Sequence, residues 1–206
     1  MGYHDFGPLR ISPKFTTVDW EALDLATKDA WPRVAEIVRD RLDGRFLSFA
    51  RLCLESPQSG FVVLAIDSLL LETIQQFRDG VVDGRNRSKE MVCKFLTGPR
   101  FQPNFDKAAR KAFYRDIRCG LLHQAEAREM WLIRRDQETM LRHHPAGAGY
   151  VIDVQRFHSA LELSFTDYLD ELRRPEADEL RKKLSVKMTE ICNVRNQRGV
   201  VFADEP

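Results

Sequence analysis

Residues 61–77 of this 206-residue chain have the sequence FVVLAIDSLLLETIQQF, and this stretch decides the fold. It is apolar on almost every side, which is typical of a helix at the centre of a core. It also carries two carboxylates, Asp67 and Glu72. A carboxylate that faces a core needs a hydrogen-bonded or cationic partner, because an isolated buried charge is very costly. We therefore expect a central helix whose two acids are both paired.

The segments on either side of this stretch predict more helices and one small β element. Residues 1–16 contain glycines and prolines and are expected to be an irregular lead-in. Apolar residues at helical spacing predict helices over about 19–30, 32–44, 46–53, 89–96, 105–127, 157–172 and 176–192, with Asn104 capping the helix that begins at 105. Two apolar runs, 130–134 and 150–154, are joined by the turn-rich residues 143–149 and predict a β-hairpin insertion over 129–153. The fold class is mainly α: one compact helical domain over residues 1–206 with a small hairpin.

Composition restricts the class of protein. The chain is 43% hydrophobic and 31% charged, which excludes a disordered chain and argues against a membrane protein. The longest uninterrupted apolar run, Phe61–Ile66, is far too short to cross a bilayer, and the first residues have no apolar signal core. The four cysteines form no Cys-x-x-Cys, which argues against a zinc knuckle and favours a reducing compartment. We expect a cytoplasmic protein with no membrane partner.

The net charge of +1 hides an uneven distribution. Residues 78–118 contain 11 Lys or Arg and 5 Asp or Glu, so this segment carries +6 while the rest of the chain carries −5. The average excludes a uniformly basic protein of the histone type. It does not exclude a local cleft that binds phosphate.

Familiar catalytic and cofactor motifs are absent from the sequence. There is no phosphate-binding Gly-x-x-x-x-Gly-Lys, no dinucleotide-binding Gly-x-Gly-x-x-Gly after a strand, no His-Glu-x-x-His and no Gly-x-Ser-x-Gly. The adjacent pair His143 and His144 could suggest a metal site, but neighbouring side chains point apart and no carboxylates accompany them. We read the pair as an exposed polar loop and expect neither a metal nor a cofactor.

One helical segment carries residues suited to chemistry. Residues 113–126 have the sequence FYRDIRCGLLHQAE, in which Arg118 is followed five positions later by His123. This Arg-x4-His pair, on a helix expected to pack against residues 61–77, resembles the signature of the HEPN superfamily, and the resemblance covers about residues 60–175. It implies a compact all-α domain, a metal-independent ribonuclease acting as a homodimer, and a role in toxin–antitoxin or antiviral defence. It also implies that Arg118 and His123 are catalytic and face a cleft at the dimer interface.

The spacing of the pair favours a site shared by two protomers. Five residues of an α-helix turn through about 500°, which leaves the two side chains about 140° apart and separated by about 7.5 Å along the axis. Two such helices that meet across a two-fold axis would bring the groups together more easily, and Gly120 would let the backbones approach. His123 suits proton transfer near neutral pH, and Arg118 suits binding of phosphate oxygens. We expect Glu72 to orient these groups and Arg115 to add a phosphate contact, with Asp116 as a further supporting residue.

Two other interpretations remain open. Glu72 and Arg118 could simply neutralise each other between packed helices, with His123 bonded to a nearby carbonyl. The chain could also be a non-catalytic HEPN-like module that dimerises or binds a nucleotide or a partner protein. Cys119 favours that module, since the family often has Asn, Asp or another polar residue directly after the Arg. The partners considered are a second copy of the chain, RNA or a nucleotide, and an antitoxin protein.

Overall fold

Helix α4 (Gly60–Asp79) runs through the middle of the protein in the computed structural model, which describes residues 8–193. Its buried side chains include Leu64, Leu71 and Phe77, none of which is exposed to solvent. Asp67 is equally buried, and its Oδ1 lies 2.8 Å from the Nδ1 of His158. The prediction of a central core helix with a partnered acid is confirmed.

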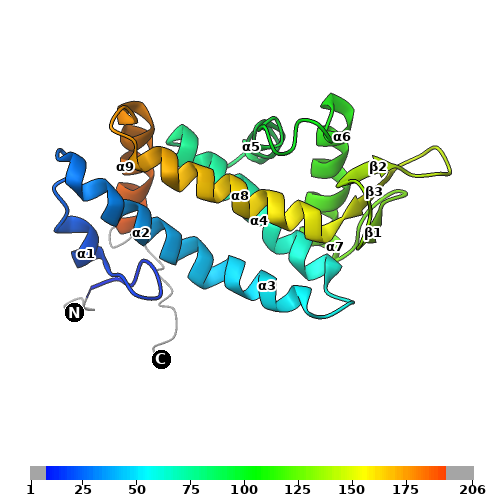
Figure 1. Cartoon of the computed structure of the whole chain (residues 1–206), viewed down its shortest axis with the longest axis horizontal. Helices are drawn as coiled ribbons and strands as arrows, with labels where there is room; N and C mark the ends of the chain where they lie inside the picture. Colours follow the sequence, from blue (N-terminus) through cyan, green and yellow to red (C-terminus); the bar gives the residue numbers. More distant parts are fainter. Residues whose placement is uncertain (1–7, 194–206) are drawn as a thin grey trace, which may run out of the picture.

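The N-terminal helices lie along one side of α4. In chain order they are α1 (Thr17–Glu21), the 3-10 turn η1 (Lys28–Ala30), α2 (Trp31–Leu42), the π-helical turn η2 (Asp43–Leu47) and α3 (Ser48–Leu54). Helix α2 packs on the long α8 (Val154–Arg173), and α3 packs on α4 (Figure 1). Residues 8–16 are irregular apart from one bridge between Arg10 and Thr16, as expected of the lead-in.

The single helix predicted over 19–30 is wrong, because the chain turns between α1 and η1. The side chain of Asp24 accepts the backbone N–H of Ala26 at 3.2 Å, and Thr27 donates its hydroxyl to the carbonyl of Asp24 at 2.9 Å. Such short-range bonds between side chain and backbone compete with helical hydrogen bonds. The helix therefore ends at Glu21 and a new one begins only at Trp31.

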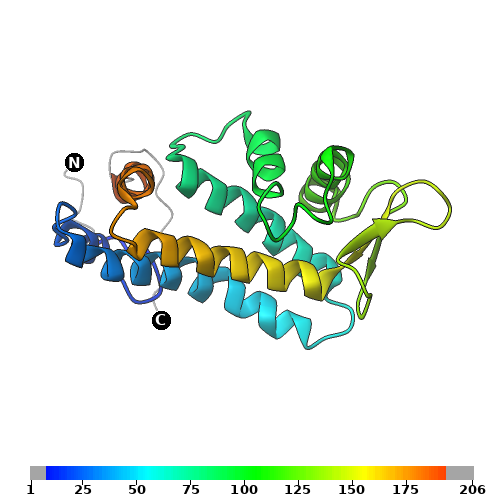
Figure 2. The same cartoon turned by 45° about the horizontal axis from the view of Figure 1, so that its top comes forward.

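The second half of the chain adds α5 (Ser88–Phe95), α6 (Lys107–Ala112), the π-helix η3 (Phe113–Arg118), α7 (Cys119–Gln124) and α9 (Asp178–Cys192). Helices α5 and α6 stand side by side on the face of α4 that α8 leaves open (Figure 2). The predicted helix over 105–127 is wrong at both ends. Asp106, rather than Asn104, caps it by accepting the N–H of Ala109 at 2.7 Å, and the helix stops before Ala125, whose φ is +54°.

The β element has three strands instead of the two that were predicted. They are β1 (Leu132–Arg134), β2 (Leu141–His143) and β3 (Tyr150–Asp153), in the sheet order β1-β3-β2. The two predicted strands pair in parallel, with Leu132 opposite Val151, while the antiparallel hairpin joins β2 to β3. Parallel neighbours need a longer connection than a hairpin turn, and residues 135–149 supply it by crossing through β2.

One buried cluster extends from Ile11 to Cys192 and includes residues from the helices and the sheet. Four phenylalanines pack ring to ring where α6 and η3 meet α8, with centroids 5.1 to 6.2 Å apart: Phe101, Phe105, Phe113 and Phe157. The described residues are therefore mainly helical with a small sheet. A single domain over the whole chain stays a prediction.

By length and composition α4 alone among the described helices could cross a membrane, with half of its apolar window buried inside the protein. Core helices of soluble proteins pass the same test, so this is weak evidence for a membrane span. The expectation of no membrane partner stays a prediction.

Candidate functional site

Glu72 and Arg118 meet where α4 packs against the end of η3. The Nη2 of Arg118 donates to the Oε2 of Glu72 at 2.9 Å, and the two side chains are 18% and 15% exposed. The same Oε2 accepts the hydroxyl of Ser88, the first residue of α5, at 2.6 Å. One carboxylate oxygen thus connects three helical segments, and Arg118 lies at the margin of the core rather than in its centre.

Arg118 has hydrogen-bonding capacity that the described residues do not use. Its Nε is buried and has no hydrogen-bond partner within residues 8–193. Its guanidinium carbon lies 5.8 Å from the centre of the Tyr114 ring. A buried donor without a hydrogen-bond partner costs about 1–3 kcal/mol of stability. The described residues therefore hold Arg118 in an orientation in which its Nε makes no hydrogen bond to them.

Tyr114 and Cys119 complete the surroundings of Arg118. Burial raises the pKa of the Tyr114 hydroxyl, and its hydrogen bond to Cys119 raises that pKa further, while a bond to Ser88 acts in the opposite direction. Cys119, where the HEPN pattern often has a polar residue, is half-buried and bonded inside this cluster. Neither Ser88 nor Tyr114 was singled out in the sequence, because neither residue belongs to a motif.

The orientation of Arg118 depends on a break in helix geometry. Phe113–Arg118 is a π-helix, with i→i+5 hydrogen bonds in place of the expected α-helical ones. This change of helix type rotates the residues at the end of the π-helix relative to the residues of α6 that precede it. Arg118 consequently faces α4, while Arg115 is 65% exposed. Single π-helical turns inside α-helices are frequent at functional sites.

Arg115 and Asp116 form a separate structural pair. The guanidinium of Arg115 donates to both carboxylate oxygens of Asp116, at 2.5 and 2.6 Å. Asp116 is 1% exposed and also accepts the indole N–H of Trp131 at 3.2 Å. Asp116 therefore anchors η3 to the chain before β1. The structure does not join these two supporting residues to Glu72 and Arg118.

His123 lies in the last turn of α7 and is exposed. Within residues 8–193 it has no hydrogen bond or ion pair, so no carbonyl there satisfies it and no contact joins it to Arg118. Gly120, between the two, is buried, and a Cβ at that position would collide with the carbonyl oxygen of Glu126. The close approach that this glycine permits is therefore to its own chain, not to a partner as the sequence suggested.

The described residues contain no group of three or more metal-binding side chains. The ring of His143 packs on that of Tyr150 with centroids 5.0 Å apart, and the Nδ1 of His144 accepts the N–H of Ala146 at 3.0 Å. Both histidines thus serve the turn between β2 and β3. The four cysteines are all free.

Arg118 is thus held by Glu72 beside Ser88 and Tyr114 at the meeting point of α4, α5 and η3, and an exposed imidazole follows on α7. Comparisons of this chain with protein-family models, curated proteins and solved structures find no match.

Proposed function

We propose that this chain is a HEPN-like, metal-independent endoribonuclease that acts as a homodimer, with Arg118 and His123 as its catalytic pair. The observation that carries the proposal is the half-buried Arg118, which Glu72 fixes in place through its Nη2 while its Nη1 has no hydrogen bond to the described residues. A fixed guanidinium with unused donors suits the non-bridging oxygens of a phosphodiester. The biological setting that we propose is toxin–antitoxin or antiviral defence.

RNA supplies its own nucleophile, so the protein must move protons and stabilise charge. The 2′-oxygen bonds to the adjacent phosphorus while the bond from phosphorus to the 5′-oxygen breaks, which leaves a 2′,3′-cyclic phosphate and a 5′-hydroxyl. The 2′-hydroxyl loses a proton and the departing 5′-oxygen gains one. His123 is exposed and suits either transfer near neutral pH. Arg118 would stabilise the added negative charge on the phosphate.

The placement of His123 supports a dimer in this proposal. No contact joins His123 to Arg118 within the described chain, so a second protomer would bring the complementary group. Helices α4 and α7, which pack on each other, also expose apolar side chains that suit self-association: Leu122 is 42% exposed, Leu69 38% and Val62 48%. In a two-fold dimer the same patch would meet itself.

The test is cleavage of a single-stranded RNA in EDTA. We expect His123→Ala and Arg118→Ala each to lower the rate at least tenfold, in line with the loss of an acid–base group or a charge-stabilising donor. Arg78→Ala is a matched control, because Arg78 is also a half-buried arginine of an ion pair, with Glu171 at 3.0 Å. His143→Ala controls for loss of an exposed histidine. Equal rates in all variants, or no cleavage by the wild type, would contradict the proposal.

The non-catalytic module remains the second candidate, favoured by the observation that Glu72 already neutralises Arg118. This candidate predicts that the wild type binds RNA or a nucleotide without cleaving RNA.

A further inference from the structure

A cleft of about 570 Å³ lies between α5 and α6. The two helices stand side by side in Figure 2. Lys89, Cys93 and Lys94 line the cleft from α5, and Lys107, Arg110 and Lys111 line it from α6. The basic segment that the sequence revealed is therefore gathered by the fold, because much of its charge faces one hollow.

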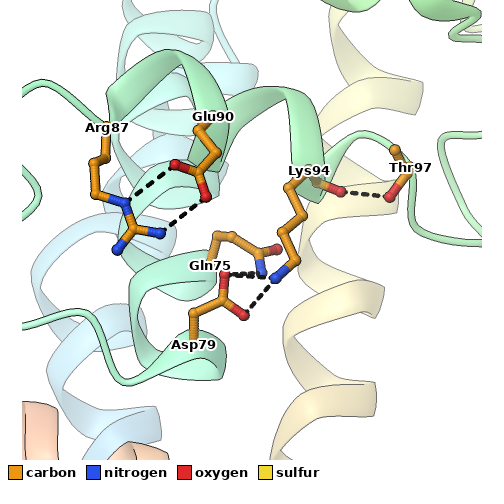
Figure 3. A network of polar contacts seen from close by, with 6 residues as sticks. All are labelled: Gln75, Asp79, Arg87, Glu90, Lys94 and Thr97. Atoms are coloured by element: carbon orange, nitrogen blue, oxygen red, sulfur yellow. Dashed lines mark hydrogen bonds and ion pairs between the residues drawn. The ribbon is translucent and has the colours of Figure 1, made fainter.

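One cation of α5 and one directly before it are already neutralised. Figure 3 shows Lys94 bonded to both carboxylate oxygens of Asp79, each at 2.8 Å. It also shows Arg87 bonded to Glu90, at 2.9 and 3.1 Å. Asp79 and Glu90 are thus each paired with one of these two cations. Glu90 lines the cleft beside the remaining cations, but its charge is already offset by Arg87.

Four cations of the cleft have no carboxylate partner within residues 8–193: Lys89, Lys107, Arg110 and Lys111. Three of them act on the half-buried Cys93 thiol. Burial raises the pKa of this thiol, and the charges of Lys89, Arg110 and Lys111 work against that rise. The thiol sulfur also contacts the carbonyl of Arg110 at 3.7 Å. The cleft is therefore a concave site of concentrated positive charge.

The cleft is lined by α6, and Arg118 follows on the same helical segment. Lys107 and Lys111 lie four residues apart on one face of α6, and Tyr114 and Arg118 follow them in η3 on the same continuous helical segment. Eleven helical residues span roughly 16 Å. On the α5 side, Lys89 in the cleft directly follows Ser88, which bonds Glu72. A strand lying in the cleft would reach the Glu72–Arg118 pair at its end.

We propose that the α5–α6 cleft binds the sugar–phosphate backbone of single-stranded RNA and directs the strand to Arg118. This proposal rests on the proposed function and adds to it the path of the substrate. Lysines that contact phosphate act as point charges, and such contacts carry no sequence information. The binding is therefore independent of sequence and strongly dependent on salt. The span of about 16 Å accommodates about four or five stacked nucleotides at roughly 3.4 Å each.

The test measures fluorescence anisotropy of a labelled single-stranded RNA that carries a 2′-O-methyl group at each position, which blocks the 2′-oxygen nucleophile so that binding is separated from cleavage. We expect the Lys107→Gln/Lys111→Gln variant to bind at least tenfold more weakly at about 0.1 M salt. Loss of two phosphate contacts should also lower the slope of log K against log salt by about 1.4. Lys14→Gln/Lys28→Gln removes the same charge from exposed lysines outside the cleft and should change the slope little. Equal losses in both double variants would overturn the proposal.

A second measurement does not depend on any cleft variant. Bound oligonucleotide should slow alkylation of Cys93 severalfold, as followed by mass spectrometry, and leave Cys53 on α3 unchanged. An unchanged rate of Cys93 alkylation at saturating oligonucleotide would also overturn the proposal that RNA binds in the α5–α6 cleft. The two proposals fail in different ways. If RNA cleavage needs Arg118 and His123 but does not depend on Lys107 and Lys111, only the proposal of an RNA-binding cleft is refuted. If RNA binding depends on the cleft lysines but no cleavage occurs, only the proposal of a ribonuclease is refuted.

Discussion

The Nη2 of Arg118 lies 2.9 Å from the Oε2 of Glu72, although the two residues are 46 positions apart. The contact fixes a cation at the margin of the core where α4, α5 and η3 meet. Ser88 donates to the same oxygen at 2.6 Å, so the carboxylate is shared between a neutral donor and a charged one. This arrangement packs Arg118 between three helical segments, in the position that the proposed phosphate contact requires.

A double-mutant cycle on Glu72 and Arg118 should give a coupling energy of about 1–3 kcal/mol, because both side chains are largely shielded from solvent. The measurement is urea unfolding of the wild type, Glu72→Ala, Arg118→Ala and the double variant. The exposed pair Arg33–Glu36 provides the control cycle, which should give less than about 1 kcal/mol. Couplings of equal size would show that the Glu72–Arg118 contact adds nothing beyond a surface pair.

Asp116→Ala should destabilise the protein by about 2–4 kcal/mol, since it removes a buried carboxylate that Arg115 and Trp131 both bond. Arg115→Ala should leave the salt slope of RNA binding unchanged, because its guanidinium is committed to Asp116. Thermal unfolding and the anisotropy assay test the two statements. A fall in slope for Arg115→Ala comparable to that of one cleft lysine would restore Arg115 as a phosphate contact.

Gly120→Ala should destabilise the fold by about 2–4 kcal/mol, because the new Cβ would strike the carbonyl of Glu126 and displace the chain after α7. Gly147→Ala is the control. Its φ of +85° makes alanine unfavourable, but no atom lies within 4 Å of the added Cβ, so about 1–2 kcal/mol is expected. Denaturant midpoints measure both. A Gly120→Ala variant as stable as Gly147→Ala would contradict the steric argument.

The stability of the protein should fall as pH rises through neutrality because of the buried pair Asp67 and His158. Burial raises the pKa of Asp67 to about 6, against the effect of its hydrogen bond to His158. Burial alone would lower the pKa of His158, but the hydrogen bond and charge of Asp67 raise it above its usual value. The folded state thus binds these protons more tightly than the unfolded chain, whose values are about 3.9 and 6.5. This stabilisation is lost between about pH 4 and the folded pKa of His158, which lies above about 6.5.

The measurement for this pair is the free energy of unfolding from pH 5.5 to 8.5, compared with an Asp67→Asn/His158→Gln variant. The difference between the wild type and the variant should shift against the wild type as pH rises. A difference that is flat, or that favours the wild type at high pH, would refute the assignment.

The sequence predicted the elements whose signal is local. Residues 61–77 form a helix because nearly every side of them is apolar, and α8 follows its spaced apolar residues from Phe157 to Leu172. Strand β2 was missed, because LRH is too short to show alternation. The cap at Asp106 competed with Asn104 two positions earlier, and both are good capping residues.

The candidate site was predictable only in part. Glu72 and Arg118 could be paired from the sequence because two helices were expected to pack and each carried one opposite charge. The Ser88–Glu72 and Asp67–His158 contacts could not, since neither Ser88 nor His158 belonged to a motif that marked it as a partner. The π-helical turn left no trace in the sequence either, although it directs Arg118 toward α4. Long-range contacts of this kind depend on how neighbouring helices are rotated and shifted against each other, and the packing of the whole core determines that arrangement.

The most direct test of the central claim mixes two inactive proteins. If Arg118 of one protomer acts with His123 of its partner, a heterodimer of Arg118→Ala and His123→Ala chains has one complete site and one site that lacks both groups. After equal mixing and exchange, half of the dimers are mixed, so RNA cleavage in EDTA should return to about one quarter of the wild-type rate. Cleavage that stays at the level of the separate variants, with exchange verified by native mass spectrometry, would contradict the shared site.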